Sequence, residues 1–177
     1  MLRFIRRTLH PAWYQGHHQG PPYFEGWYFK LVDAGERQQL AVIPGIFKAQ
    51  DPGAGHAFIQ ILDGRSGVAT YHAYPADAFR ASQRSFDVRI GDSRFTLDGL
   101  TLDVDADDRT LTGQVTFNGL TPWPVKWSSP GVMGWFAWVP LLQTYHGILS
   151  LDHAIDGSLT LNGQRIDFDG GRGYVEK

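Results

Sequence analysis

Residues 99–117, GLTLDVDADDRTLTGQVTF, decide the fold of this chain. Apolar and polar residues alternate from Leu100 to Val104, and the same alternation returns from Leu111 to Phe117. A period of two places the apolar side chains on one face of an extended segment, which is typical of a half-buried strand. The polar turn Asp105–Arg109 connects the two runs, so two successive short strands are predicted here.

Comparable short segments recur on both sides of this pair. The other expected strands are Tyr23–Val32, Gln39–Phe47 with an interruption at Pro44-Gly45, Ala57–Leu62, Val68–Tyr74, Ser85–Ile90, Arg94–Leu97, Tyr145–Ile155, Ser158–Leu161 and Gln164–Phe168. Asn162-Gly163 and Gly91-Asp92 are tight hairpin signals. Only Ala76–Ser82 predicts a brief helical turn, and residues 1–22 are expected to form an irregular lead-in. About ten short strands with little helix predict an all-β antiparallel barrel or sandwich.

Composition agrees with this fold class and excludes several functions. The 177 residues suit a single domain, and 14% of them are aromatic, a class that favours strands. Fifteen of the 18 acidic residues are Asp, which forms turns more readily than helices. The absence of Cys excludes disulfides, thiol catalysis and Cys-ligated metals. A net charge of −2 gives no broad electrostatic footprint for nucleic acid.

The seven His residues do not form a metal motif. His17 and His18 are adjacent, and His56, His72, His146 and His153 are scattered without a short ligand spacing. No phosphate-binding loop or dinucleotide fingerprint is present, so we expect neither a metal nor a cofactor.

The sequence carries no recognisable signal peptide or membrane-spanning segment. The N-terminal residues MLRFIRRTLH are basic but lack the apolar core of a secretory signal. The apolar run 132–142 falls short of the roughly 20 residues that span a bilayer. We therefore expect a soluble, cytoplasmic protein.

Glu25 is the most interesting ionisable residue as a candidate for a catalytic role. In an extended strand it shares a face with Tyr23, Trp27, Phe29 and Leu31, whereas Lys30 lies on the opposite face. If that face lines a barrel, burial among aromatic rings would keep the carboxyl protonated and suited to act as a general acid. The alternative is a carboxylate paired with Arg or Lys that fixes the barrel geometry.

The tryptophans also allow two interpretations. Trp27, Trp135 and Trp138 could line a cavity for an apolar ligand and stabilise a cation through their faces, or they could be packing residues. Residues 131–142 are too apolar for an ordinary exposed loop. They are expected to cover a barrel mouth, to pack against another protein half or a second copy in a homodimer, or to touch a membrane surface.

The run Tyr23–Lys30, YFEGWYFK, resembles the opening motif of the tocopherol cyclase-like family. Further stretches resemble that family in the same order: AFIQILDG at 57–64, SPGVMGWFAWVP at 129–140, Tyr145–Gly147 with Ser150–His153, and GGRGYVEK at 170–177. The resemblance covers most of the chain from residue 10 onward.

This resemblance implies a lipocalin-like (calycin-type) barrel over residues 23–177, corresponding to the N-terminal half of a two-barrel protein. It also implies an amphiphilic isoprenoid or other apolar ligand, and acid-catalysed closure of a prenylated hydroquinone to a chromanol. The implied proton donor is Glu25, followed by His146 and Asp152, with His153 as a further relay candidate. The implied ligand contacts are Trp27, Phe29, Trp135, Trp138 and Tyr145. Glu176 and Lys177 match the closing motif but are expected to be frayed. The alternative function is a non-catalytic carrier of hydrophobic ligands.

Overall fold

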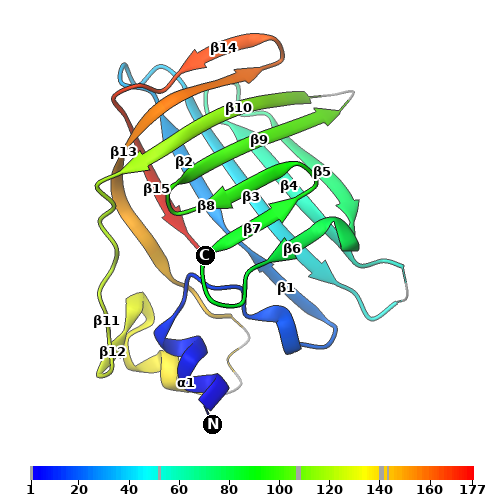
Figure 1. Ribbon diagram of the computed structural model, residues 1–177, viewed down its shortest axis with the longest axis vertical. Helices are drawn as coiled ribbons and strands as arrows, with labels where there is room; N and C mark the ends of the chain where they lie inside the picture. Colours follow the sequence, from blue (N-terminus) through cyan, green and yellow to red (C-terminus); the bar gives the residue numbers. More distant parts are fainter. Residues whose placement is uncertain (1, 52, 107–108, 140–141, 143) are drawn as a thin grey trace.

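The computed structural model describes residues 2–51, 53–106, 109–139, 142 and 144–177. Thirteen strands form one antiparallel sheet that curls strongly into a barrel-like shape (Figure 1). Its order is β5-β4-β3-β2-β15-β13-β10-β9-β8-β7-β6, with β1 paired to β3 and β14 paired to β13. The edge strands β5 and β6 do not pair with each other in the described part of the chain. The all-β antiparallel prediction is confirmed.

The strands occupy much of the chain between residues 23 and 176. Their bounds are β1 Tyr23–Gly26, β2 Tyr28–Val32, β3 Gln39–Lys48, β4 His56–Asp63, β5 Ala69–Pro75, β6 Phe79–Ala81, β7 Asp87–Ile90, β8 Ser93–Thr96, β9 Gly99–Ala106, β10 Arg109–Asn118, β13 Ile148–Leu161, β14 Gln164–Asp167 and β15 Gly171–Glu176. The decisive stretch forms the β9–β10 pair, in which Leu111 lies opposite Val104 and both are buried. Residues 107 and 108 of the expected turn lie outside the described residues.

Strand β3 differs from its prediction because it runs without a break through Pro44-Gly45. The N–H of Trp27 donates to the carbonyl of Pro44 at 3.0 Å, but proline has no N–H with which to return the bond. The strand that is interrupted is therefore the one beside β3, which is divided into β1 and β2, and not β3 itself.

Three further elements differ from the sequence-based expectations. The two segments expected at 145–155 and 158–161 form one strand, β13. Strand β15 was not expected at all. In the lead-in, residues 2–9 form helix α1 (Leu2–Leu9) and residues 16–18 a 3-10 turn η1 (Gly16–His18). The brief helical turn expected at 76–82 is present as η2 (Ala76–Ala78), which leads directly into β6.

Aromatic rings occupy the barrel interior. Trp27, Phe29, Phe95 and Phe168 are completely buried, and Phe29 packs against Phe95 and Phe117 with ring centroids 6.0 and 6.2 Å apart. This core accounts for the high aromatic content of the chain, since each buried ring removes a large apolar area from water.

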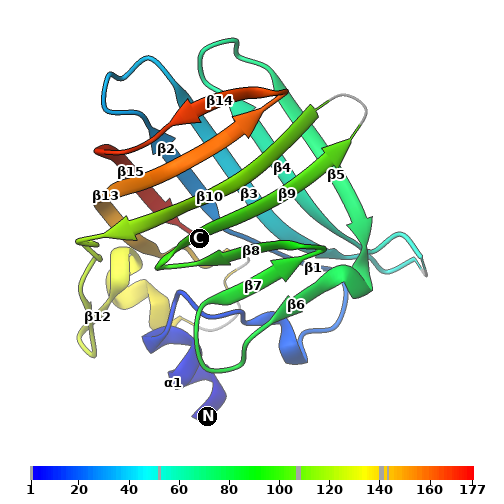
Figure 2. The same ribbon diagram turned by 45° about the horizontal axis from the view of Figure 1, so that its top comes forward.

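Several small elements gather at one end of the barrel. Helix α1 lies there beside the two-stranded hairpin β11 (Val125–Lys126) and β12 (Ser129–Pro130) and the 3-10 segment η3 (Gly131–Trp138), and two views show this arrangement (Figures 1 and 2). Residues 140 and 141 of the apolar segment 131–142 lie outside the described residues. Among the residues described, no helix combines the length and apolar character needed to cross a membrane.

Candidate functional site

Residues 10–19, here called the cover segment, pack against the barrel end that α1 also approaches. Tyr14 is buried and belongs to the core cluster. The indole Nε1 of Trp27 donates to the carbonyl of Ala12 at 3.1 Å. The ammonium of Lys48 donates to the carbonyl oxygens of Gly16 and Gln19 at 2.6 and 3.1 Å. Side chains of the barrel thus hold the backbone of this segment in place.

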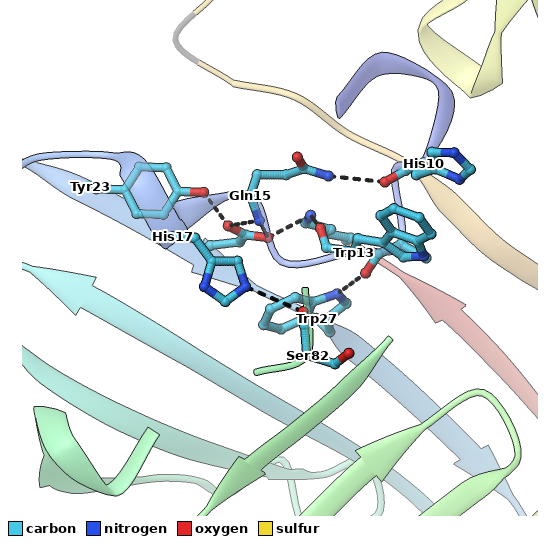
Figure 3. A network of polar contacts seen from close by, with 10 residues as sticks. His10, Trp13, Gln15, His17, Tyr23, Trp27 and Ser82 are labelled. Atoms are coloured by element: carbon cyan, nitrogen blue, oxygen red, sulfur yellow. Dashed lines mark hydrogen bonds and ion pairs between the residues drawn. The ribbon is translucent and has the colours of Figure 1, made fainter. Parts of the chain in front are cut away.

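Figure 3 shows Trp13, Gln15, Tyr23 and Trp27 in the polar network that links this segment to the barrel. Glu25 of β1 is its central acceptor. Both of its carboxylate oxygens accept from the backbone N–H of Gln15 at 3.0 Å, and the hydroxyl of Tyr23 donates to Oε2. The ammonium of Lys177 lies 2.5 Å from Oε1. Burial raises the pKa of Tyr23, and the neighbouring carboxylate raises it further, so the phenol remains a donor.

Lys177 holds the other side of this network. Its side chain is 9% exposed, and its ammonium also donates to the carbonyl of Trp13 at 2.5 Å. Its backbone N–H and carbonyl form hydrogen bonds of 2.8 and 2.9 Å with Gly147. Burial lowers the pKa of Lys177, and the Glu25 carboxylate opposes that shift. The expectation of fraying is therefore wrong, because the final motif pairs with β13 and β2 and buries its last side chain.

This arrangement matches the second interpretation of Glu25, a carboxylate paired with a cation. Glu25 does lie on the predicted face, with Trp27, Phe29 and Leu31 buried along it. Each of its polar contacts named above is with a donor, so the arrangement gives it the role of an acceptor that fixes the cover segment. Lys30 is exposed on the opposite face, as expected.

The predicted ligand contacts separate into two groups. Trp27 and Phe29 are completely buried core residues. Trp135, by contrast, is 62% exposed and stacks on Phe136 with a centroid distance of 4.2 Å. Trp138 is half-buried and donates from Nε1 to the carbonyl of Trp127 at 2.9 Å.

Tyr145 and His146 lie next to the Lys177 side of the network. The Tyr145 ring lies 4.0 Å from the Arg7 guanidinium carbon, and its hydroxyl donates to the carbonyl of Val139 at 2.9 Å. His146 is exposed, with Nε2 3.3 Å from Glu176. Both residues line a narrow recess together with Lys177 and Met133. The structure therefore places Tyr145 and His146 near the partner of Glu25.

Asp152 and His153 lie elsewhere. Asp152 forms a two-bond ion pair with Arg172 on the barrel wall, and this guanidinium lowers the pKa of the carboxyl. His153 is 2% exposed, faces Phe117 and hydrogen-bonds to the hydroxyl of Ser150 at 3.0 Å. Burial lowers its pKa and so disfavours the charged imidazolium, whereas the Asp152 carboxylate opposes that shift. Neither residue lines the recess of Tyr145 and His146.

A larger pocket of about 330 Å³ opens between α1 and the cover segment. Its wall combines aromatic rings with cationic or titratable nitrogen groups, and contains no carboxylate among the described residues. The lining residues are Phe4, Arg6, Arg7, Trp13, Tyr14, Gln15, His17, His18, Gln19 and Gln83. The guanidinium carbon of Arg6 lies 4.7 Å from the centre of the Trp13 ring. Sequence reasoning missed this pocket, although aromatic and basic residues without any acid before Glu25 were a visible signal.

Among the described residues, no group of three or more His, Asp or Glu side chains could hold a metal ion. Lys177 and Gln15 were the other functional residues that sequence reasoning missed. The resemblance of residues 170–177 to a family motif was a signal for Lys177, but nothing in the sequence paired it with Glu25.

Comparison with known proteins supports the fold. No family model matches the chain, and no curated protein matches it in sequence. The solved structure of CghA with Sch210972 superposes with a TM-score of 0.51 and 16% identity, over 86% of this chain and 44% of that one. Kievitone hydratase from Nectria haematococca gives a TM-score of 0.48 and 14% identity, over 90% and 48%. The chain thus spans about half the length of these proteins and shares with CghA a lipocalin-like, antiparallel barrel fold.

Proposed function

We propose that the protein binds a small amphiphilic molecule in the pocket between α1 and the cover segment. The observation that carries this proposal is the composition of its wall, in which aromatic rings lie beside Arg6, Arg7, His17 and His18. An apolar body can pack on the rings while a phenolic, hydroxyl or carboxylate oxygen accepts hydrogen bonds from the basic groups. The pocket volume of about 330 Å³ lies at the lower end of the range for small-molecule sites.

The packing of the barrel favours ligand binding at this end over binding in the barrel interior. Trp27, Phe29 and Phe95 fill the space that a ligand would need inside the sheet. The Arg7 side chain gives a further reason to choose the end, since its buried Nε has no hydrogen-bond partner in the described structure. The CghA structure, which contains Sch210972, supports the idea that barrels of this kind accommodate small molecules.

Ring closure of a prenylated hydroquinone is the catalytic form of this proposal. A proton added to the prenyl double bond would create a carbocation, the phenol oxygen would bond to that carbon, and the phenol proton would pass to a base, so no atom is gained or lost. His146 is the better candidate donor, because it is exposed at the recess and contacts Glu176. Glu25 acts as a positioning residue that holds Gln15 and Lys177 at the wall of that recess.

A non-catalytic carrier is the second candidate, and the pairing of Glu25 with Lys177 favours it. A barrel whose buried carboxylate is already bound by an ammonium and a phenol needs no reaction to explain that residue. Both candidates require the pocket between α1 and the cover segment. The catalytic one also requires the prenyl chain to reach the recess of His146, which shares Arg7 and Gln15 with that pocket. Binding and turnover must therefore be measured separately.

Binding is tested by calorimetry with a geranylated hydroquinone and with its chromanol. Arg7→Met removes the guanidinium but keeps an apolar stem. We expect the affinity for these ligands to fall about tenfold, because one charge-assisted hydrogen bond is lost. Arg37→Met is the matched control, since Arg37 lines a different pocket, around Asp33 and Ile166. Equal affinities for both variants and the unmodified protein would exclude this pocket.

Turnover is tested by chromatography for chromanol after incubation with the same hydroquinone. Product that is lost in His146→Gln and kept in Glu25→Gln supports His146 as the donor and Glu25 as a positioning residue. Product lost only in Glu25→Gln, in a variant that still binds the hydroquinone, would assign the acid to Glu25. Binding without product in the unmodified chain supports the carrier.

A further inference from the structure

Two long segments that contribute to the barrel end that carries α1 contain no acidic residues. Neither residues 1–24 nor residues 109–151 contain an Asp or Glu, although the whole chain has 18. These segments include α1, the β11–β12 hairpin and η3, which gather at one end in both views (Figures 1 and 2). Arg6 and Lys126 are exposed there. We call α1, residues 123–130 with strands β11 and β12, and η3 together the aromatic end.

This end also exposes large apolar side chains. Trp127 is 64% exposed, Trp135 62% and Phe136 53%, and Trp123 and Val125 are exposed by more than a third. They make up five of the nine exposed large hydrophobic residues found in the described part of the chain. Such a concentration marks an interaction surface, whereas single exposed apolar residues are ordinary.

The exposed rings are held in fixed positions. Trp127 lies in the turn of the β11–β12 hairpin, beside Lys126. Its ring packs on Trp138 at 4.7 Å between centroids, and its carbonyl accepts from the Trp138 indole. Trp138 in turn contacts Phe4 of α1 at 6.1 Å. The aromatic end is therefore one packed unit that presents its outermost rings to solvent.

We propose that the aromatic end binds the surface of a lipid bilayer that contains anionic lipids. Indole rings favour the boundary between headgroups and hydrocarbon, because one edge is polar and the rest is apolar. Exposed Lys and Arg with no neighbouring carboxylate in these segments complement the negative charge of anionic headgroups. A second copy of the chain is the other possible occupant, and the test below distinguishes it from a bilayer.

The inference goes beyond the proposed ligand pocket and does not depend on it. Residues of α1, namely Phe4, Arg6 and Arg7, line that pocket, so it opens at the same end. An amphiphile dissolved in the bilayer would reach the pocket without crossing water. Failure to bind any hydroquinone would not contradict the proposed bilayer contact. Failure to bind vesicles would likewise not contradict the proposed ligand pocket.

The test is co-sedimentation with vesicles of phosphatidylcholine, with and without phosphatidylglycerol. We expect the protein to bind the anionic vesicles more tightly and to lose part of that affinity in high salt, which screens surface charges. Trp135→Ser/Phe136→Ser should weaken binding by about tenfold, since it removes two inserted rings. Tyr71→Ser is the matched control, because Tyr71 is 51% exposed on the edge strand β5, outside the aromatic end.

Charge is tested separately. Lys126→Glu should weaken binding to anionic vesicles by at least about fivefold and leave the weaker binding to neutral vesicles unchanged. Lys30→Glu on the barrel wall is the control and should behave as the unmodified protein. Circular dichroism is used to check that each variant is folded.

Absence of vesicle binding, or binding unaffected by Trp135→Ser/Phe136→Ser, would overturn the proposal. A dimer in light scattering that the same double variant converts to a monomer would overturn it too, because a second copy would then cover the aromatic end. A protein that stays monomeric and binds vesicles only when the aromatic end is intact supports the proposal.

Discussion

Replacing Lys177 with Met should destabilise the barrel and loosen its cover segment. The variant removes the ammonium but keeps an unbranched apolar side chain, leaving the Glu25 carboxylate in a site where its side chain is 5% exposed. Removing one partner of a buried ion pair costs about 3–5 kcal/mol. Because Tyr23 and the N–H of Gln15 continue to donate to Glu25, we expect the lower end of that range.

The measurement is urea unfolding followed by tryptophan fluorescence, together with thermal melting. For a domain of this size a loss of about 3 kcal/mol lowers Tm by about 6–12 °C. Glu25→Gln should lose a similar amount, since it leaves the ammonium unpaired. The double variant Glu25→Gln/Lys177→Met buries no charge, so its loss should fall short of the sum of the single losses by about 2 kcal/mol.

The control is Arg94→Met, which breaks an ion pair with Asp87 whose side chains are 47% and 30% exposed. Exposed pairs contribute below about 1 kcal/mol, so this variant should unfold almost as the unmodified protein does. If Lys177→Met also lost less than about 1 kcal/mol, or if the two single losses added in the double variant, the pair would not hold the cover segment.

Three further predictions concern residues of the adjacent strands β13 and β15. Burial holds the pKa of His153 in the folded protein below its ordinary value of 6.5. As the pH falls below 6.5, the unfolded chain therefore binds more protons at this residue than the folded chain does. The free energy of unfolding should therefore decrease below pH 6.5 by at most about 1.4 kcal/mol per pH unit from this group, and urea titrations across that range should show a smaller decrease for His153→Phe. A side chain at Gly173 would meet the imidazole of His153, so Gly173→Ala should lower the free energy of unfolding by about 1–3 kcal/mol in the same titration. Asp152→Asn breaks only an exposed pair with Arg172, and calorimetry should show unchanged hydroquinone affinity with a stability loss below about 1 kcal/mol.

Alternation along the chain predicted most of the strands. Leu100–Val104 and Leu111–Phe117 lie in paired strands with their apolar faces buried, and the face shared by Glu25 and Trp27 was also predicted correctly. Such patterns work because the side-chain period depends only on local backbone geometry. Helix α1 was missed even though Leu2, Ile5 and Leu9 recur at helical spacing, since residues 1–22 were interpreted together as one irregular lead-in.

The candidate site depended on contacts that no local pattern contains. Lys177 donates to Trp13 across 164 residues of sequence, and it reaches Glu25 only because β15 pairs with β2. Residues 170–177 were matched only as a family-like closing motif whose last two residues were expected to be frayed, and strand β15 was missed there. The pocket was missed for the same reason, because it forms only when α1 and the cover segment pack beside Gln83.

The pairing of β2 with β15 also sets an order for folding. Strand β2 ends at Val32 and must wait for residues 171–176 before it gains its second neighbour. During synthesis, hairpins such as β9–β10 can form early from adjacent residues. The joining of β2 to β13 through β15 and the docking of the cover segment come last. A ribosome that stalls before residue 171 would therefore present β2 as an open sheet edge, a surface that chaperones bind and that nascent chains use to aggregate.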